Sequence, residues 1–130
     1  MSTNKICVVV VSGSLERLQM AAMVASVAAV SGQDVMIFLS MNALTYFLKD
    51  NTEKAQYEGD MGKLMASKQV PEFKTLFEQA VELGDARIFP CSMAMDVLGV
   101  EQDGLEDYLQ KATGLTKFLH DAQDGQVWTF

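Results

Sequence analysis

The sequence predicts an α/β fold with a mostly parallel sheet of about five strands, and two observations lead to this prediction. Residues 5–11 and 34–39 are runs of aliphatic and β-branched residues without polar alternation, which is typical of parallel strands buried on both faces. These runs alternate with helical segments through short turns, as in strand–helix–strand units. A chain of 130 residues fits one domain, which we expect to span residues 1–130.

The first predicted helix covers residues 15–30. Ser14 is a suitable N-cap, and Glu16 places a negative charge in the first turn. From residue 20 to residue 30 the segment is apolar all round except at Ser26, which indicates burial on more than one side. We expect one side to face the sheet and another to face a second subunit.

The remaining elements follow in order along the chain. We expect a short helix over 43–48, an irregular segment over 49–71, helices over 72–83 and 92–98, a strand over 86–89, a very short strand at Val100, a helix over 104–120 with a break near Gly114, and a last strand over 126–130. An irregular segment as long as 49–71 is usually functional or mobile. It could fold over an apolar site through its methionines, or it could pack on a neighbouring subunit.

Composition and charge exclude several classes of function. The net charge is −7, and its whole excess lies in residues 72–130, with eleven acidic and four basic side chains. Nucleic acid is therefore not an expected partner, because its binders present a basic face. The sequence has no apolar run of ~18 residues that could span a membrane and nothing that resembles a signal peptide. Two cysteines in such a chain indicate free thiols in a reducing compartment, and we expect a cytoplasmic protein.

The most informative residue is Cys91, which follows the predicted strand at 86–89 and Pro90 and precedes the predicted helix at 92–98. Unpaired N–H groups and the helix dipole at such a position stabilise a thiolate, the nucleophilic form of cysteine. The N–H groups of Met93 and Ala94 would point at the sulfur or at an anion bound to it. If the Asp96 carboxylate turns towards Cys91, it raises the thiol pKa or relays a proton.

Ligands of open parallel sheets bind beyond the carboxyl ends of the strands, where three predicted turns lie together. These turns supply the expected residues for sulfur or anion binding. They are Gly13, Ser14, Asn42, Ser92, Met93 and Ala94. The glycine spacing of a dinucleotide-binding turn and the lysine of a phosphate loop are both absent, and no cofactor is expected.

Cys7, the second thiol, lies in the first predicted strand, and we interpret it as a core residue. If the strands are level, four residues at ~3.3 Å each separate it from Cys91 along the sheet, too far for a disulfide. His120, the single histidine, is interpreted as a surface residue. No clustered histidines or cysteines have metal-ligand spacing, so no metal is expected.

The segment Cys91-Ser-Met-Ala-Met-Asp-Val-Leu-Gly99 resembles the cysteine motif of the DsrE/DsrF-like sulfur-transfer family, in particular its peroxiredoxin-like DsrE subfamily. Looser similarity extends over residues 8–14, 32–38, the loop before Val70-Pro71, 82–84 and 114–119. The resemblance implies one domain with a three-layer α/β/α, flavodoxin-like arrangement that assembles into oligomers. Ala94 departs from the serine expected there in many relatives, which would slow transfer or favour binding over transfer.

The resemblance implies that Cys91 carries sulfane sulfur as a persulfide and exchanges it with rhodanese-like and TusA-like partner proteins. The protein would then be a sulfur carrier or sulfurtransferase. Two alternatives remain open: a single-cysteine thiol peroxidase that uses Cys91, and a non-catalytic oligomeric binding module in which Cys91 is inert.

Overall fold

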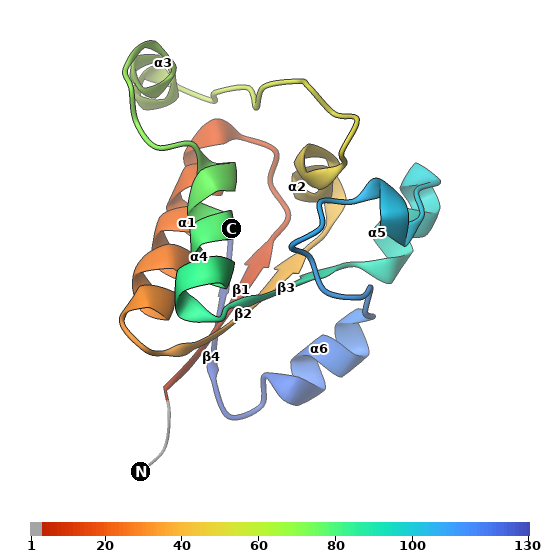
Figure 1. The fold of residues 1–130 in the computed structure, drawn as a ribbon. Helices are drawn as coiled ribbons and strands as arrows, with labels where there is room; N and C mark the ends of the chain where they lie inside the picture. The colour runs from red at the N-terminus through yellow and green to blue at the C-terminus, as the bar shows by residue number, and fades with distance from the viewer. Residues whose placement is uncertain (1–3) are drawn as a thin grey trace.

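The computed structural model describes residues 4–130 and confirms the parallel α/β fold (Figure 1). Its strands are β1 (Lys5–Val10), β2 (Asp34–Leu39), β3 (Arg87–Pro90) and β4 (Gln126–Thr129). They form one parallel sheet in the order β3-β2-β1-β4. This sheet has four strands where the sequence predicts about five, and the difference is at Val100.

Val100 caps a helix instead of beginning a strand. The N–H of Val100 donates to the Met95 carbonyl at 3.1 Å, and the N–H of Gly99 donates to the Asp96 carbonyl at 3.2 Å. This pair of bonds is the Schellman pattern that closes the C-terminus of α5 (Ser92–Leu98). Gly99 takes the left-handed conformation that the pattern requires, with a φ of 69°.

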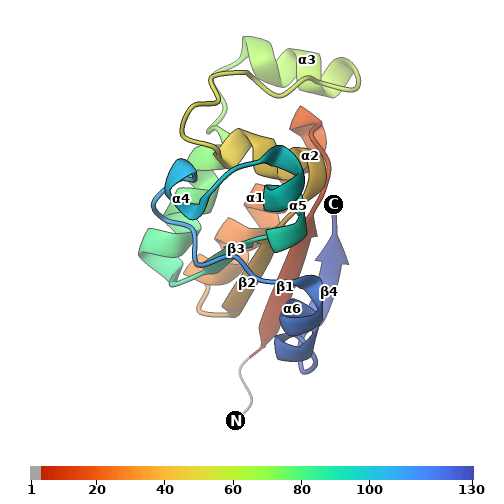
Figure 2. The ribbon, with the colours of Figure 1, turned by 90° about the vertical axis from the view of Figure 1, so that its right-hand side faces the viewer.

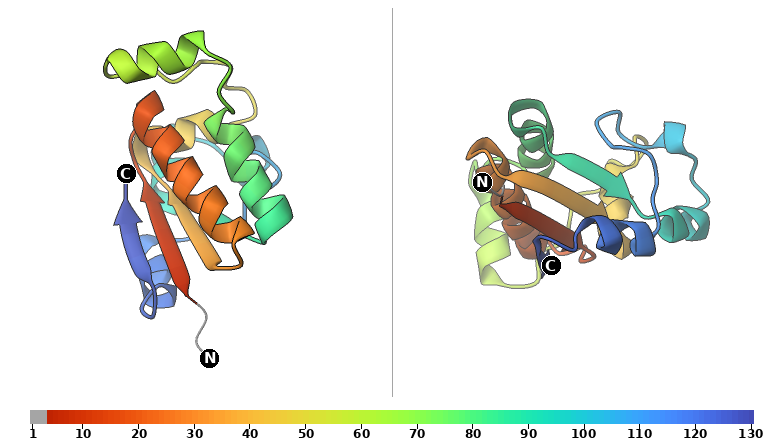
Figure 3. Two further views of the ribbon diagram at one scale, coloured as in Figure 1. Left: turned by 90° about the vertical axis from the view of Figure 1, so that its left-hand side faces the viewer. Right: turned by 90° about the horizontal axis from the view of Figure 1, so that it is seen from below.

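Helices cover both faces of the sheet (Figure 3). The helices α1 (Leu15–Val30) and α4 (Phe73–Gly84) pack side by side on one face, and α6 (Leu115–Asp121) lies on the other. Phe118 of α6 lies against Phe38 of β2, with ring centroids 5.0 Å apart. As predicted, Ser14 caps α1: its hydroxyl accepts the N–H of Arg17.

The remaining helices lie at the carboxyl edge of the sheet or beyond it (Figure 1). The helix predicted over 43–48 is a short α2 (Met41–Leu44) that continues as the 3₁₀ turn η1 (Thr45–Phe47). The segment 49–71 is not irregular throughout, because it contains α3 (Asp60–Ser67), whose N-cap residue is Gly59. Among residues 4–130, no helix combines the length and the apolar character needed to cross a membrane.

The helix predicted over 104–120 forms only in its last third. A 3₁₀ turn, η2 (Gln102–Gly104), precedes an extended stretch that runs along the β3 side of the sheet (Figure 2). There the N–H of Gln110 donates to the Ile88 carbonyl at 2.7 Å, and the N–H of Thr113 donates to the Pro90 carbonyl at 3.0 Å. These backbone donors pair with β3 and are unavailable to a helix, so α6 starts only after Gly114.

Candidate functional site at the carboxyl edge of the sheet

Cys91 lies where the sequence predicts it, between the end of β3 and the start of α5. It is the N-cap residue of α5 and has the extended backbone that an N-cap requires, with a φ of −73° and a ψ of 122°. Its carbonyl accepts the N–H of Met95 at 3.0 Å, the first hydrogen bond of the helix. The cysteine is therefore held at the carboxyl edge of the sheet, where this class of fold binds ligands.

Main-chain hydrogen bonds fix Cys91 from two sides. Its N–H donates to the Leu39 carbonyl of β2 at 2.9 Å. On the other side, Cys91 and Thr113 form an isolated parallel bridge, and the N–H of Ser92 donates to the Thr113 carbonyl at 3.0 Å. Backbone hydrogen bonds to β2 and to the segment before α6 thus hold Cys91 in place. Both join residues that are far apart in the sequence.

The sulfur of Cys91 is shielded and makes no capping hydrogen bond. The N–H groups of Met93 and Ala94 form no hydrogen bond with the sulfur in this structure, and their role towards an anion bound to the sulfur stays a prediction. Only 4% of Cys91 is exposed, whereas Met93 beside it is 49% exposed. A reactant would therefore approach Cys91 past the exposed first turn of α5, whose residues Ser92 and Met93 are both on the surface.

Met41, next to this edge, has a backbone conformation that is unusual for a side chain of its size. Its φ is 51°, in the left-handed region, and the residue is 54% exposed. Such a position costs roughly 1 kcal/mol or more and tends to occur at functional sites. Because Cys91 bonds the Leu39 carbonyl two residues before Met41, this strained turn belongs to the same edge of the sheet.

A second group of predicted residues lines a separate cavity of about 510 Å³ between the turn after β1 and η1. Gly13, Ser14 and Asn42 lie in its wall. Space for a side chain at Gly13 is tight, because a Cβ at this position would lie 3.0 Å from the Asn42 Cβ. The remaining lining residues are Ser12, Thr45, Tyr46, Gln56, Tyr57 and Glu58. We call this space the polar cavity, since hydroxyl, amide and carboxylate groups surround it.

The predicted site residues therefore fall into two groups. Gly13, Ser14 and Asn42 line the polar cavity, whereas Cys91 and residues 92–94 surround the β3–α5 junction. Cys91 is not among the residues that line the polar cavity. The sequence places both groups at the carboxyl edge correctly, but it does not show that α2 and the strand order give them different surroundings.

Cys7 is fully buried in β1, as expected, and burial raises the pKa of its thiol. The strands are level: Cys7 pairs with Met36, which pairs with Arg87 on β3. Cys91 lies four residues beyond Arg87, about 13 Å along the strands, and β2 separates the two strands. Both thiols are free, and the argument against a disulfide between them is confirmed.

The other candidates lie on the surface. Asp96 and His120 are both exposed, on α5 and α6 respectively. Among residues 4–130, no group of three or more histidine, cysteine or acidic side chains is arranged to hold a metal ion. Several cavity residues carried no sequence signal, among them Tyr46, Tyr57 and Glu58. They come from segments far apart in the chain, and only the fold brings them to the Gly13 turn.

Comparison with known families identifies the class of protein. Residues 51–130 match the model of the DsrE/DsrF/DrsH-like family, more than half of the chain, and the chain belongs to this family. The matched region includes α3, α4, β3 and the whole Cys91 segment. Among curated proteins, none is significantly similar to the chain.

Solved structures share the fold. The ychN protein from E. coli matches with a TM-score of 0.70 at 16% sequence identity, over 99% of this chain and 100% of that one. The protein of unknown function MTH1491 from Methanobacterium thermoautotrophicum matches with a TM-score of 0.61 at 12% identity, over 98% and 99% of the two chains. At these identities the comparison establishes the fold alone. The structural similarity covers nearly the whole chain, whereas the family match covers residues 51–130.

Proposed function

We propose that residues 1–130 form a single DsrE/DsrF-like domain that relays sulfane sulfur as a persulfide on Cys91. The position of Cys91 supports this most directly: it is the N-cap of α5 at the carboxyl edge of the sheet, in a chain of the DsrE/DsrF/DrsH-like family. Family membership supports a role related to sulfur relay. The residue-level assignment and the persulfide chemistry are our own inference.

The transfer consists of two exchange steps that need no external oxidant or reductant. The Cys91 thiolate attacks the outer sulfur of a donor persulfide, the donor S–S bond breaks, and the donor leaves as a thiolate. An acceptor thiolate then attacks the outer sulfur of the Cys91 persulfide and releases the Cys91 thiolate. Each step forms one S–S bond and breaks one.

The surroundings of Cys91 suit a sulfur carrier. Burial of the thiol limits competing oxidation by small oxidants, while the exposed Met93 offers a soft, polarisable surface for an approaching sulfur. A persulfide places its outer sulfur about 2.05 Å beyond Sγ, which extends the reach of this buried side chain. The donor and acceptor we expect are thiol proteins of the rhodanese-like and TusA-like kinds, in the reducing cytoplasm.

We also propose that the protein is a homo-oligomer. The outer face of α1 keeps large apolar side chains exposed, with Val27 at 67% and Val30 at 59%. Such a face on a soluble domain is typical of an interface.

The test of the sulfur-relay proposal is the mass of the reduced protein after brief exposure to polysulfide, followed by peptide mapping. We expect added sulfur on the Cys91 peptide, removable by dithiothreitol, and none in Cys91→Ser. Cys7→Ala is the matched control, because it removes the other thiol without burying an unpaired hydroxyl, and it should load like the wild type.

Three outcomes would reject the proposal in different ways. Loading that persists in Cys91→Ser would show that sulfur binds elsewhere. Absence of loading together with rapid sulfenic acid formation on peroxide would favour a thiol peroxidase. A Cys91 inert to both reagents would favour a binding module.

A further inference from the structure

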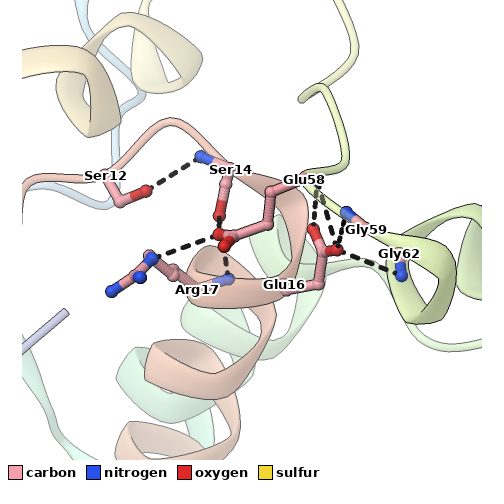
Figure 4. A network of polar contacts seen from close by, with 7 residues as sticks. All are labelled: Ser12, Ser14, Glu16, Arg17, Glu58, Gly59 and Gly62. Atoms are coloured by element: carbon pink, nitrogen blue, oxygen red, sulfur yellow. Dashed lines mark hydrogen bonds and ion pairs between the residues drawn. The ribbon is translucent and has the colours of Figure 1, made fainter.

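Hydrogen bonds of two glutamates, Glu16 and Glu58, connect the segment before α3 to the start of α1 (Figure 4). The Glu16 carboxylate accepts three backbone N–H groups: those of Glu58 at 2.9 Å, Gly59 at 2.8 Å and Gly62 at 3.2 Å. Gly59 and Gly62 lie at the N-terminus of α3, whose first N–H groups have no partner within the helix. A residue of α1 therefore caps α3.

The second glutamate acts in the opposite direction. The Glu58 carboxylate accepts the hydroxyl of Ser14, the N-cap of α1, at 2.5 Å, and the Arg17 Nε at 3.1 Å. Carboxylates near a helix N-terminus are favoured by the helix dipole. Glu16 of α1 therefore lies at the N-terminus of α3, and Glu58, just before α3, lies at the N-terminus of α1. The N–H of Leu15 also donates to the Gln56 carbonyl at 2.8 Å.

Apart from these bonds, α3 makes few packing contacts with the rest of the domain. Gly62 is the one residue of α3 that is buried, whereas Met61 is 65% and Leu64 is 53% exposed. The Arg17–Glu58 ion pair is itself exposed and would contribute little. Since apolar burial is small, the backbone bonds to Glu16 are the principal attachment of this end of the segment.

The attached segment forms one wall of the polar cavity. Gln56, Tyr57 and Glu58 line this cavity opposite the turn at Gly13 and the start of η1. The cavity is partly open to solvent, and if residues 56–62 moved away from α1 it would lose this wall altogether. The capping bonds and the shape of the cavity are therefore coupled.

We propose that residues 56–67 form a flap over the polar cavity, and that the negative charges of Glu16 and Glu58 keep it closed. Neutralising either carboxylate weakens the charge-assisted hydrogen bonds and opens the flap. The inference does not depend on the sulfur-relay proposal, because Cys91 does not line this cavity. It assigns a conformational role to two glutamates that have none in the sulfur chemistry.

The effect of pH has a definite sign. Hydrogen bonds from backbone N–H groups, led by that of Glu58, hold the pKa of the Glu16 carboxyl below its ordinary value. A group with a lowered pKa favours the closed form above its ordinary pKa, and this contribution is lost as pH falls through the lowered pKa. The charged groups around the two helix starts are Glu16, Arg17, Glu58 and Asp60. Acidic pH therefore opens the flap.

The test is amide hydrogen exchange of residues 56–67, expressed as protection relative to the unfolded rate at each pH. We expect Glu16→Gln to lower protection over residues 58–62 roughly five- to tenfold at neutral pH, since its charge-assisted bonds to three backbone N–H groups become neutral ones. Glu58→Gln should lower protection less, because the ion pair of Glu58 with Arg17 is exposed. Glu72→Gln is the matched control: Glu72 is an exposed carboxylate that makes no side-chain capping bond to α4, and its loss should leave the segment protected.

A steric variant tests the same flap without a change of charge. A Cβ at Gly62 would lie 2.5 Å from the Glu16 Cδ, so Gly62→Ala should displace the carboxylate and lower protection over residues 58–62 at every pH. Unchanged protection in all three variants would refute the flap. A loss of protection that extended equally through β1 and β2 would refute it too, because the opening would then be global unfolding.

Discussion

Asp85 and Gly99 end α4 and α5 in the same left-handed conformation, with φ values of 57° and 69°. Glycine adopts this conformation without a steric penalty, whereas an L residue with a side chain is strained in it. Asp85 also places a negative charge at the negative end of the dipole of α4. The two helix ends thus have the same geometry but different residues. Replacing Asp85 by glycine and Gly99 by a residue with a side chain should therefore change stability in opposite directions.

Asp85→Gly should therefore raise the free energy of unfolding by about 0.5–1 kcal/mol, the gain from relieved strain being partly offset by a more flexible unfolded chain. Gly99→Ala should lower it by about 1 kcal/mol for the converse reason. Urea unfolding followed by circular dichroism measures both. If the two substitutions changed stability in the same direction, the left-handed backbone would not be the deciding factor.

At the same scale, the sequence locates Cys91 but not its environment. The order of strand, proline, cysteine and helix is local information, and it predicts the N-cap position correctly. The bond from Cys91 to the Leu39 carbonyl and the bridge to Thr113 join segments far apart in the chain. Local patterns hold no information on such contacts, so the shielding of the thiol could not be predicted.

At the scale of elements, α1 and α4 approach each other closely at Gly84. A Cβ at this position would lie 2.5 Å from the Ala29 Cβ and 2.6 Å from the Ala29 carbonyl carbon. Backbone atoms cannot yield as the end of a flexible side chain can, so relief requires the two helices to separate. Gly84 therefore does more than end α4: it sets the spacing of the helical layer.

We expect Gly84→Ala to destabilise the protein by about 1–3 kcal/mol, the range for overpacking a well-packed contact. Gly104→Ala is the matched control: a Cβ there meets no atom within 4 Å and should change stability by less than about 0.5 kcal/mol. Thermal or urea unfolding of both variants checks this. Equal stability of the two variants would show that α1 and α4 adjust at no cost.

The sequence predicts best the elements whose own hydrophobic pattern indicates which of their residues are buried. The β-branched run of β1 and the apolar length of α1 are examples, and both bounds agree with the structure within one residue. By contrast, α3 is held by capping bonds from Glu16 and has little apolar burial, so its helical pattern is weak. The prediction of a helix over residues 105–113 is wrong for a related reason. The N–H groups of Gln110 and Thr113 donate to carbonyls of β3, and that of Glu106 donates to the Phe47 carbonyl.

The outer surface of α1 and the edge strand β4 form a continuous apolar groove of about 490 Å³ on the surface of the domain. Met23 and Val27 of α1 line it together with Trp128 of β4, which is 43% exposed. None of its lining residues is charged. A second copy of a chain with a net charge of −7 could therefore pack here without burying like charges against each other.

This surface is where we expect the copies of the proposed homo-oligomer to meet. Val27, the most exposed of the apolar residues of α1, lies within it, so Val27→Glu should convert the oligomer towards monomer by burying an unpaired carboxylate. Leu83→Glu is the control, because Leu83 is similarly exposed, at 71%, but belongs to α4 and does not line the groove. Sedimentation analysis over a range of concentrations measures the change. A wild type that stays monomeric, or dissociation by Leu83→Glu but not by Val27→Glu, would place any contact elsewhere.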